Sequence, residues 1–130
     1  MNRQSTVNEI KQTLGLVPEW MNQMPDGGLE GFWTMARDFW LAETAVPNKY
    51  KELIGLAISG VTRCRYCALF HTEAARLFGA TEEEISEANM MAGLSMAGST
   101  FINGQQIDYD QFKKETLSII EYVKSHAAAA

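Results

Sequence analysis

Two cysteines and a histidine lie close together in the segment CRYCALFH, with the spacing Cys-x-x-Cys-x-x-x-His. Cys64 and Cys67 can close a short disulfide, and the unpaired N–H groups at the start of a helix favour a thiolate there. Arg63 and Arg65 flank the pair, and their positive charges favour the thiolate further. This combination is typical of a reactive dithiol.

A base and a carboxylate accompany the dithiol. His71 follows Cys67 by four residues, which puts both on one face of a helix, one turn apart. The imidazole could take a proton from the thiol, because histidine is a base near neutral pH. If the chain reverses near residues 61–64, Glu52 and His71 each lie roughly 10–15 Å from the turn and can meet across it. A carboxylate there would orient the imidazole and stabilise its charged form.

A zinc site is one alternative for the same residues. Thiolate and imidazole are ligands that zinc accepts, and a fourth ligand could come from Glu52 or His126. Against zinc, the chain has no second cysteine pair and no histidine pair. A pair of buried, inert cysteines is another alternative, because free cysteine is commonly buried as a small apolar side chain. The spacing favours the dithiol over both, and no metal or cofactor is expected.

Helices must position these residues. Apolar residues recur every three to four positions and no alternating strand pattern is visible, so the sequence predicts an all-α bundle of about six helices. Thr81 with Glu84 forms a capping box that opens one helix. Asp108 with Gln111 opens another in the same way, and Gly79 ends one. The dithiol falls at the start of a central helix. The expected helices cover about residues 7–14, 28–43, 47–61, 65–78, 81–101 and 109–125.

Two apolar stretches need a partner surface. Methionines and small residues gather in the middle of the helix expected over 81–101, around Met90, Met91 and Met96. They predict a core position or an oligomer interface, with the wall of a small apolar substrate pocket as the alternative. An aromatic stripe at helical spacing predicts a core or subunit contact in the helix expected over 28–43. The stripe consists of Phe32, Trp33, Ala36, Phe39 and Trp40.

The composition limits the class of protein. The chain has 130 residues, of which 46% are hydrophobic and 21% are charged, which is ordinary for one globular domain with a single core. A net charge of −5 without a dense block of Lys and Arg argues against nucleic acid as a partner. The N-terminus is polar and no apolar run is long enough to span a membrane. We therefore expect a cytoplasmic protein without a membrane partner, whose thiols are kept reduced.

The chemistry-bearing residues also match a known pattern. Glu52 is followed after eleven residues by Cys64, and then by Cys67 and His71. This resembles the E-x11-C-x2-C-x3-H signature of the alkylhydroperoxidase D-like (AhpD-like) proteins, within the carboxymuconolactone decarboxylase superfamily. The surrounding segment, YKELIGLAISGVTRCRYCALFHTEAARLFGATEEEI, is also similar to that family's core. We expect a single AhpD-like domain over residues 1–130, with the family core at about 45–102 and an N-terminal helical extension over 1–44.

The resemblance implies a homotrimer or homohexamer that works as a thiol peroxidase on small hydroperoxides. By resemblance, Cys67 attacks the peroxide and becomes a sulfenic acid, and Cys64 resolves it to a Cys64–Cys67 disulfide. Glu52 and His71 form the proton relay that activates Cys67. The implied electron donor is a dithiol carrier of the lipoyl or thioredoxin type. Local physics leaves the order of the thiols open, because the helix start favours Cys64 as the thiolate and the base favours Cys67.

One position departs from the family pattern. Some members carry a second histidine between the cysteines, where this chain has Tyr66. A tyrosine hydroxyl is not a base near neutral pH, so a relay through this position is not expected. Two alternative functions stay open. One is a redox-sensing or disulfide-exchange module without significant peroxide turnover, and the other is a lyase or decarboxylase-like member of the superfamily.

Overall fold

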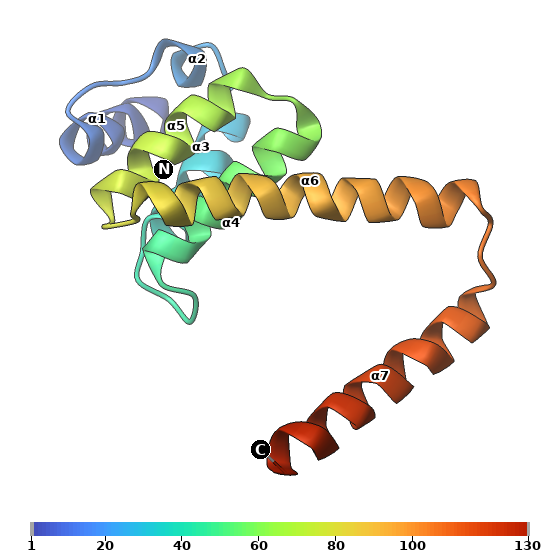
Figure 1. Cartoon of the computed structure of the whole chain (residues 1–130). Coiled ribbons are helices and arrows are strands. Elements are labelled where there is room, and N and C mark those ends of the chain that lie inside the picture. Colours follow the sequence, from blue (N-terminus) through green and yellow to red (C-terminus); the bar gives the residue numbers. More distant parts are fainter. Residues whose placement is uncertain (1, 130) are drawn as a thin grey trace.

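The computed structural model describes residues 2–129, and the prediction of an all-α fold is confirmed because these residues contain helices and no β-strand. None of the helices within this range has the length and apolar character needed to cross a bilayer. Figure 1 shows packed helices followed by one long helix that stands apart. The elements are α1 (Arg3–Leu14), α2 (Glu19–Asn22), α3 (Asp26–Met35), the π-helical turn η1 (Ala36–Trp40), α4 (Asn48–Thr62), α5 (Arg65–Leu77), α6 (Glu82–Gly104) and α7 (Tyr109–Ala129).

Helix boundaries differ from the predicted ones mainly near the N-terminus. α1 begins at Arg3, earlier than expected, because the Asn2 side chain caps it by accepting a hydrogen bond from the Ser5 N–H at 2.9 Å. That first turn is polar, so an apolar pattern does not reveal it. The prediction of one helix over 28–43 is wrong, since α3 passes into η1, which ends at Trp40. The short α2 was not predicted.

The predicted helix caps are confirmed. The Thr81 hydroxyl accepts a hydrogen bond from the Glu84 N–H at 3.0 Å, and the Glu84 carboxylate accepts one from the Thr81 N–H at 2.8 Å. Asp108 Oδ2 accepts a hydrogen bond from the Gln111 N–H at 2.9 Å, which is the Asp108 half of the predicted box; the Gln111 side chain instead donates to Glu115 at 2.8 Å. After α5, Gly79 has a φ of 87°, a left-handed conformation that favours glycine. These local signals fix where the second half of the chain turns.

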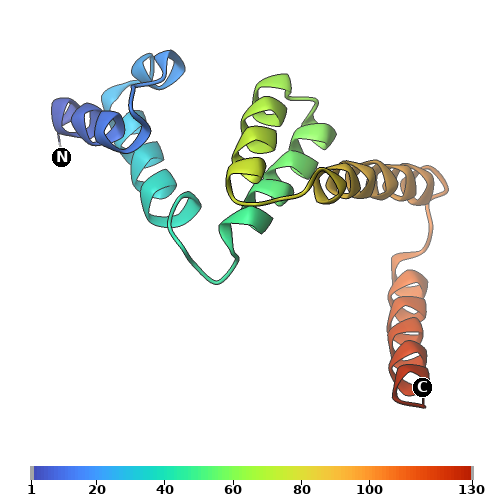
Figure 2. The ribbon, with the colours of Figure 1, turned by 60° about the vertical axis from the view of Figure 1, so that its left-hand side comes forward.

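α4, α5 and α6 form the central body, in which α4 packs against both of its neighbours (Figure 2). Arg63, with a φ of 56°, makes the tight turn between α4 and α5. Because this turn is short, α4 and α5 run antiparallel, and residues at similar distances from the turn face each other. Leu56, Ala75 and Ile85 are buried where the three helices meet.

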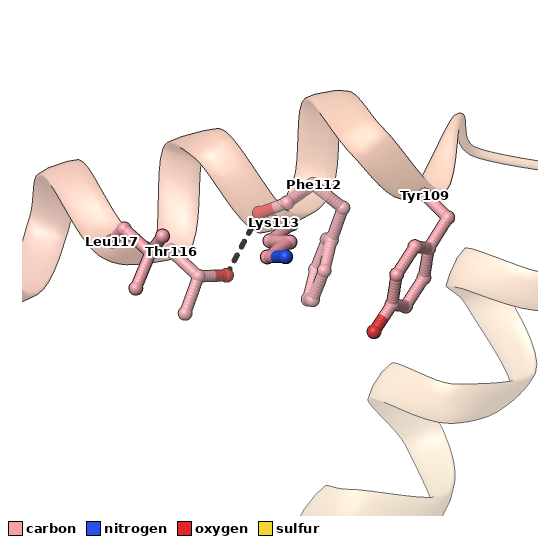
Figure 3. A pocket seen from close by; sticks show the side chains of 5 residues that line it. All are labelled: Tyr109, Phe112, Lys113, Thr116 and Leu117. Atoms are coloured by element: carbon pink, nitrogen blue, oxygen red, sulfur yellow. Dashed lines mark hydrogen bonds between the residues drawn. The ribbon is translucent and has the colours of Figure 1, made fainter.

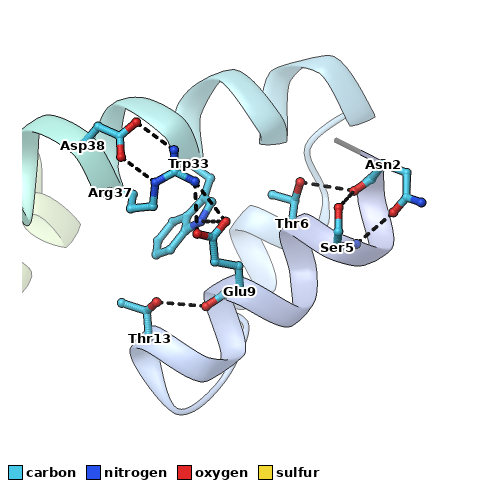
Figure 4. Close-up of polar contacts among 8 residues, drawn as sticks. All are labelled: Asn2, Ser5, Thr6, Glu9, Thr13, Trp33, Arg37 and Asp38. Atoms are coloured by element: carbon cyan, nitrogen blue, oxygen red, sulfur yellow. Dashed lines mark hydrogen bonds and ion pairs between the residues drawn. The ribbon is translucent and has the colours of Figure 1, made fainter.

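α1, α2, α3 and η1 form a second body with its own core. Glu9 Oε2 accepts a hydrogen bond from the Trp33 indole at 3.0 Å, and Arg37 Nη1 donates to both Glu9 oxygens at 3.0 and 3.1 Å (Figure 4). Arg37 also donates to Asp38, and this hydrogen bond holds the pKa of Asp38 below its ordinary value. The core residues are Ile10, Met21, Leu29, Trp33 and Ala36, so part of the predicted aromatic stripe is buried as expected.

α7 stands away from the other helices (Figures 1 and 2). Residues 109–127 are all exposed, and a shallow pocket forms on α7 alone (Figure 3). α6 also carries exposed apolar side chains, and Met90 and Met91 are 73% and 57% exposed. The core alternative is therefore wrong for Met90 and Met91 within one chain, while Met96 is half-buried. The alternative of an oligomer interface stays a prediction.

The capping box of α6 predicts how stability depends on pH. The hydrogen bond from the Thr81 backbone, followed by one from Lys49, lowers the pKa of Glu84 below its ordinary value of 4.5. A lowered pKa in the folded state stabilises the protein above the unfolded-state pKa, and this contribution is lost as pH falls below about 4.5. Glu84→Gln removes the titrating group. Its free energy of unfolding is therefore expected to fall less steeply with acid than that of the unmodified chain.

Urea denaturation at several pH values between neutral and about 3.5 measures this slope. Glu83→Gln, on the same turn of α6, is the matched control and should keep the slope of the unmodified chain. Identical slopes for Glu84→Gln and Glu83→Gln would contradict the assignment.

Candidate functional site

A buried carboxylate and an imidazole meet between α4 and α5. Glu52 is only 1% exposed, and its Oε2 atom lies 2.6 Å from Nδ1 of His71. An ionised carboxylate only accepts hydrogen bonds, so with Glu52 ionised the proton of this contact lies on Nδ1 of His71. The predicted meeting of the two residues across the α4–α5 turn is therefore observed. Their catalytic role stays a prediction.

Gly55 makes room for the imidazole. It lies on α4, three residues after Glu52 and therefore on the same face of the helix. A Cβ atom placed on Gly55 would lie 2.6 Å from Cε1 of His71 and 2.7 Å from both ring nitrogens. Real Cβ atoms essentially never come that close to another heavy atom. The ring therefore lies directly against the backbone of α4.

Trp40 completes the surroundings of the carboxylate and was not predicted as a site residue. Its indole Nε1 donates a hydrogen bond to Glu52 Oε1 at 2.7 Å, so both carboxylate oxygens have a donor. The Trp40 ring centroid lies 5.6 Å from that of His71 and 5.2 Å from that of Phe70. Burial of an ionised carboxylate is costly unless hydrogen bonds compensate for the lost water. Trp40 supplies one of the two that Glu52 receives.

The two cysteines come together at the start of α5, as the sequence predicts. They are joined as a disulfide with a Cα–Cα separation of 5.4 Å. Cys64 is the N-cap residue, and its Sγ accepts a hydrogen bond from the Cys67 N–H at 3.2 Å. Cys64 is half-buried and Cys67 is exposed, so neither is a fully buried cysteine. His71 lies one turn further along α5.

The other predicted candidates lie outside this arrangement. His126 is on α7, where it stacks on Tyr122 with ring centroids 3.9 Å apart. Within residues 2–129, His, Cys, Asp and Glu side chains form no group of three or more that could hold a metal ion. Tyr66 is 73% exposed, and Arg65 Nη2 donates to its hydroxyl at 3.2 Å. The Tyr66 side chain is therefore mostly exposed to solvent.

The close approach at Gly55 gives a testable consequence for stability. Alanine is the better helix former by about 1 kcal/mol, so Gly55→Ala would stabilise α4 if the space beside it were open. The clash with His71 reverses this sign, and we expect a loss of about 1–3 kcal/mol in the free energy of unfolding. Urea denaturation measures the difference.

Gly60→Ala is the matched control on the same helix. A Cβ atom at Gly60 would lie 3.7 Å from the Ala92 Cβ, an ordinary contact, so this variant should be at least as stable as the unmodified chain. If both variants were equally stable, the imidazole would not be fixed against Gly55.

Comparison with known proteins identifies the family of this chain. The model of the carboxymuconolactone decarboxylase family matches residues 29–101, more than half of the chain. This range includes most of α3 and all of η1, so Trp40 lies inside it. The predicted division near residue 45 between a family core and an N-terminal extension stays a prediction.

One curated protein and two solved structures are similar. Uncharacterized protein 4 in the cox locus of Paracoccus denitrificans is 35% identical over 65 residues, and this match covers 50% of the chain and 59% of that relative. The alkylhydroperoxidase AhpD core from Rhodospirillum rubrum is 27% identical with a TM-score of 0.71, over 83% of this chain and 82% of that chain. A structural-genomics target from Methanobacterium thermoautotrophicum is 31% identical with a TM-score of 0.59, over 67% and 96% respectively.

The family match, the similarity to an AhpD core and the Cys-x-x-Cys pair agree with one another. The chain belongs to the carboxymuconolactone decarboxylase family and is an AhpD-like member of it.

Proposed function

We propose that this protein is a thiol peroxidase that reduces small hydroperoxides with the dithiol of Cys64 and Cys67. The observation that carries the proposal is the contact between buried Glu52 and half-buried His71, with His71 one helical turn from Cys67 on α5. A base oriented by a carboxylate next to a thiol is the arrangement that activates a nucleophile. Membership of an AhpD-like family supports the same reaction. The proposal places the protein in the cytoplasm, where thiols are kept reduced.

The first half of the reaction consumes the peroxide. His71 takes the proton of the Cys67 thiol, and the thiolate attacks the terminal oxygen of the hydroperoxide. The O–O bond breaks, the leaving oxygen takes the proton from the imidazolium, and an alcohol departs. Cys67 is oxidised to a sulfenic acid. Glu52 stabilises the imidazolium while the charge is present.

The second half regenerates the thiols. Cys64 gives up its proton and attacks the sulfur of Cys67, the S–O bond breaks, and the departing hydroxide takes up a proton and leaves as water, which produces the disulfide. An external dithiol carrier of the lipoyl or thioredoxin type then reduces that disulfide by exchange through a mixed disulfide. The two electrons gained by the peroxide thus come from the donor. Within the protein, the reaction uses only the thiols of Cys64 and Cys67, and the reductant comes from outside.

The order of the two cysteines is inferred from the family resemblance and from exposure. Cys67 is exposed, so a peroxide can reach it, and it shares a helix face with His71. Cys64 accepts the N-cap hydrogen bond, which favours a thiolate there once the disulfide is reduced. A thiolate at Cys64 suits the resolving role, because it must attack the sulfenic acid quickly.

A redox-sensing or disulfide-exchange module is the second candidate. Tyr66 takes the place of the second histidine that some members carry, and it lies exposed against Arg65 rather than in a relay. A sensor needs the disulfide to form but does not need rapid turnover. A lyase-like activity, in contrast, would survive alkylation of both thiols.

Peroxide turnover distinguishes these candidates. Reduced protein is mixed with tert-butyl hydroperoxide and dihydrolipoamide, and peroxide loss is followed while mass spectrometry reports the state of the cysteines. Cys67→Ser should abolish turnover. Glu52→Gln and His71→Ala should each slow it by about 10²–10⁴-fold, the usual cost of losing a general base.

His126→Ala is the matched control, because it removes the other histidine of the chain, which lies on α7. It should leave turnover unchanged. Full activity of Cys67→Ser would refute the peroxidase. A disulfide that forms once and does not cycle would favour the sensor.

We further propose that the protein works as a homotrimer or homohexamer. An isolated helix is only marginally stable in water, yet α7 extends for 21 residues without packing on its own chain. Exposed Phe112, Ile119 and Val123 recur on one face of α7. α6 exposes Met90, Met91 and further apolar side chains. Apolar faces of this extent favour contact with further copies of the chain.

Size-exclusion chromatography with light scattering tests the assembly. The unmodified chain should have three or six times the 14.5 kDa mass of one copy. Ile119→Glu places a charge on the apolar face of α7 and should lower that mass, because an unpaired charge is costly to bury. Ser118→Glu, off that apolar face, is the control and should retain it. A monomeric unmodified chain would refute the assembly.

A further inference from the structure

Trp40 links the two bodies of the chain at the carboxylate. Its side chain packs against the core of the N-terminal helices, and its indole N–H reaches Glu52 on α4 at 2.7 Å. Lys51, the residue before Glu52, donates hydrogen bonds to the backbone carbonyls of Phe39 and Ala42 at 2.7 and 2.8 Å. These two contacts hold the end of η1 against α4. The bond between Trp40 and Glu52 is therefore part of a connected attachment.

The π-helical turn decides where Trp40 points. The Leu41 N–H donates to the Ala36 carbonyl at 2.8 Å, five residues back, whereas an α-helix would use four. Trp40 follows Trp33 by seven residues. In a continuous α-helix this spacing would put both side chains on the same face, toward the core beside α1. The additional residue rotates the end of the helix by about a quarter of a turn. Trp40 thus reaches α4, while Trp33 bonds to Glu9 on α1.

We propose that Trp40 is a positioning residue for the relay, supplied to the site by the N-terminal body. The indole N–H occupies Glu52 Oε1, which fixes the carboxylate so that Oε2 faces Nδ1 of His71. Without this donor, the buried carboxylate has one unsatisfied oxygen and is free to rotate or recruit water. The hydrogen bond that holds the Nδ1 proton and the orientation of the His71 imidazole is then weakened. Only the consequence for peroxide turnover rests on the proposed function.

The proton on His71 Nδ1 is the readout, because it reports the relay without any peroxide. The full-length disulfide form is labelled with ¹⁵N, and the imidazole N–H resonance and its exchange with water are measured by NMR. Trp40→Phe keeps an aromatic ring but removes the donor. We expect exchange of the Nδ1 proton to become faster by about tenfold or more, as for the loss of a hydrogen bond to a charged group.

Trp33→Phe is the matched control. It also removes an indole hydrogen bond to a carboxylate in the N-terminal body, at 3.0 Å from Glu9, but the bond does not involve Glu52. Exchange at His71 should keep its original rate in this variant. An unchanged rate in Trp40→Phe, or an equal increase in both variants, would overturn the proposal.

A second replacement covers the case in which Trp40→Phe does not fold. Incorporation of 3-benzothienylalanine at position 40 keeps the shape of tryptophan and replaces only the N–H with sulfur. The same faster exchange is expected, and an unchanged rate overturns the proposal. Faster exchange in a chain that shows no peroxide turnover would refute the peroxidase and leave the role of Trp40 intact.

Discussion

A carboxylate removed from water needs partners for its charge, and Glu52 depends on two of them. His71 approaches from α5, and Trp40 approaches from η1. Each of these two contacts depends on a different turn in the backbone. The tight turn at Arg63 brings α5 back along α4, and the π-helical turn directs the indole across to α4. The helices on both sides of α4 are therefore organised around one side chain.

The N-terminal helices form more than an added layer. Their core is held together by the Glu9 network and by packing around Trp33. Trp40 packs against that core and extends into the central body, where its ring contacts the rings of Phe70 and His71. The cysteine pair lies at the start of α5, where Cys64 is half-buried and Cys67 is exposed. The buried carboxylate thus comes from α4 and its two donors come from η1 and α5, while both cysteines lie at the start of α5.

Local signals in the sequence predict much of this arrangement. The capping box at Thr81 depends on neighbouring residues only, and so does the turn that brings Glu52 to His71. Trp40 is different, because its direction depends on one additional residue in a helical turn that has no clear pattern. Regular helical spacing therefore assigns Trp40 to the core stripe. The exposure of Met90 could not be predicted either, because an apolar helix face has the same sequence pattern whether its own chain or another copy covers it.

The contact between Gly55 and the imidazole also restricts how the sequence can vary over time. The space beside α4 can hold either a side chain at position 55 or the ring of His71, but not both. A single mutation at either position empties or overfills that space. A larger residue at position 55 therefore requires a smaller one at position 71, or a shift of the ring or of α4. Positions 55 and 71 thus share one small volume, and each limits what the other can hold.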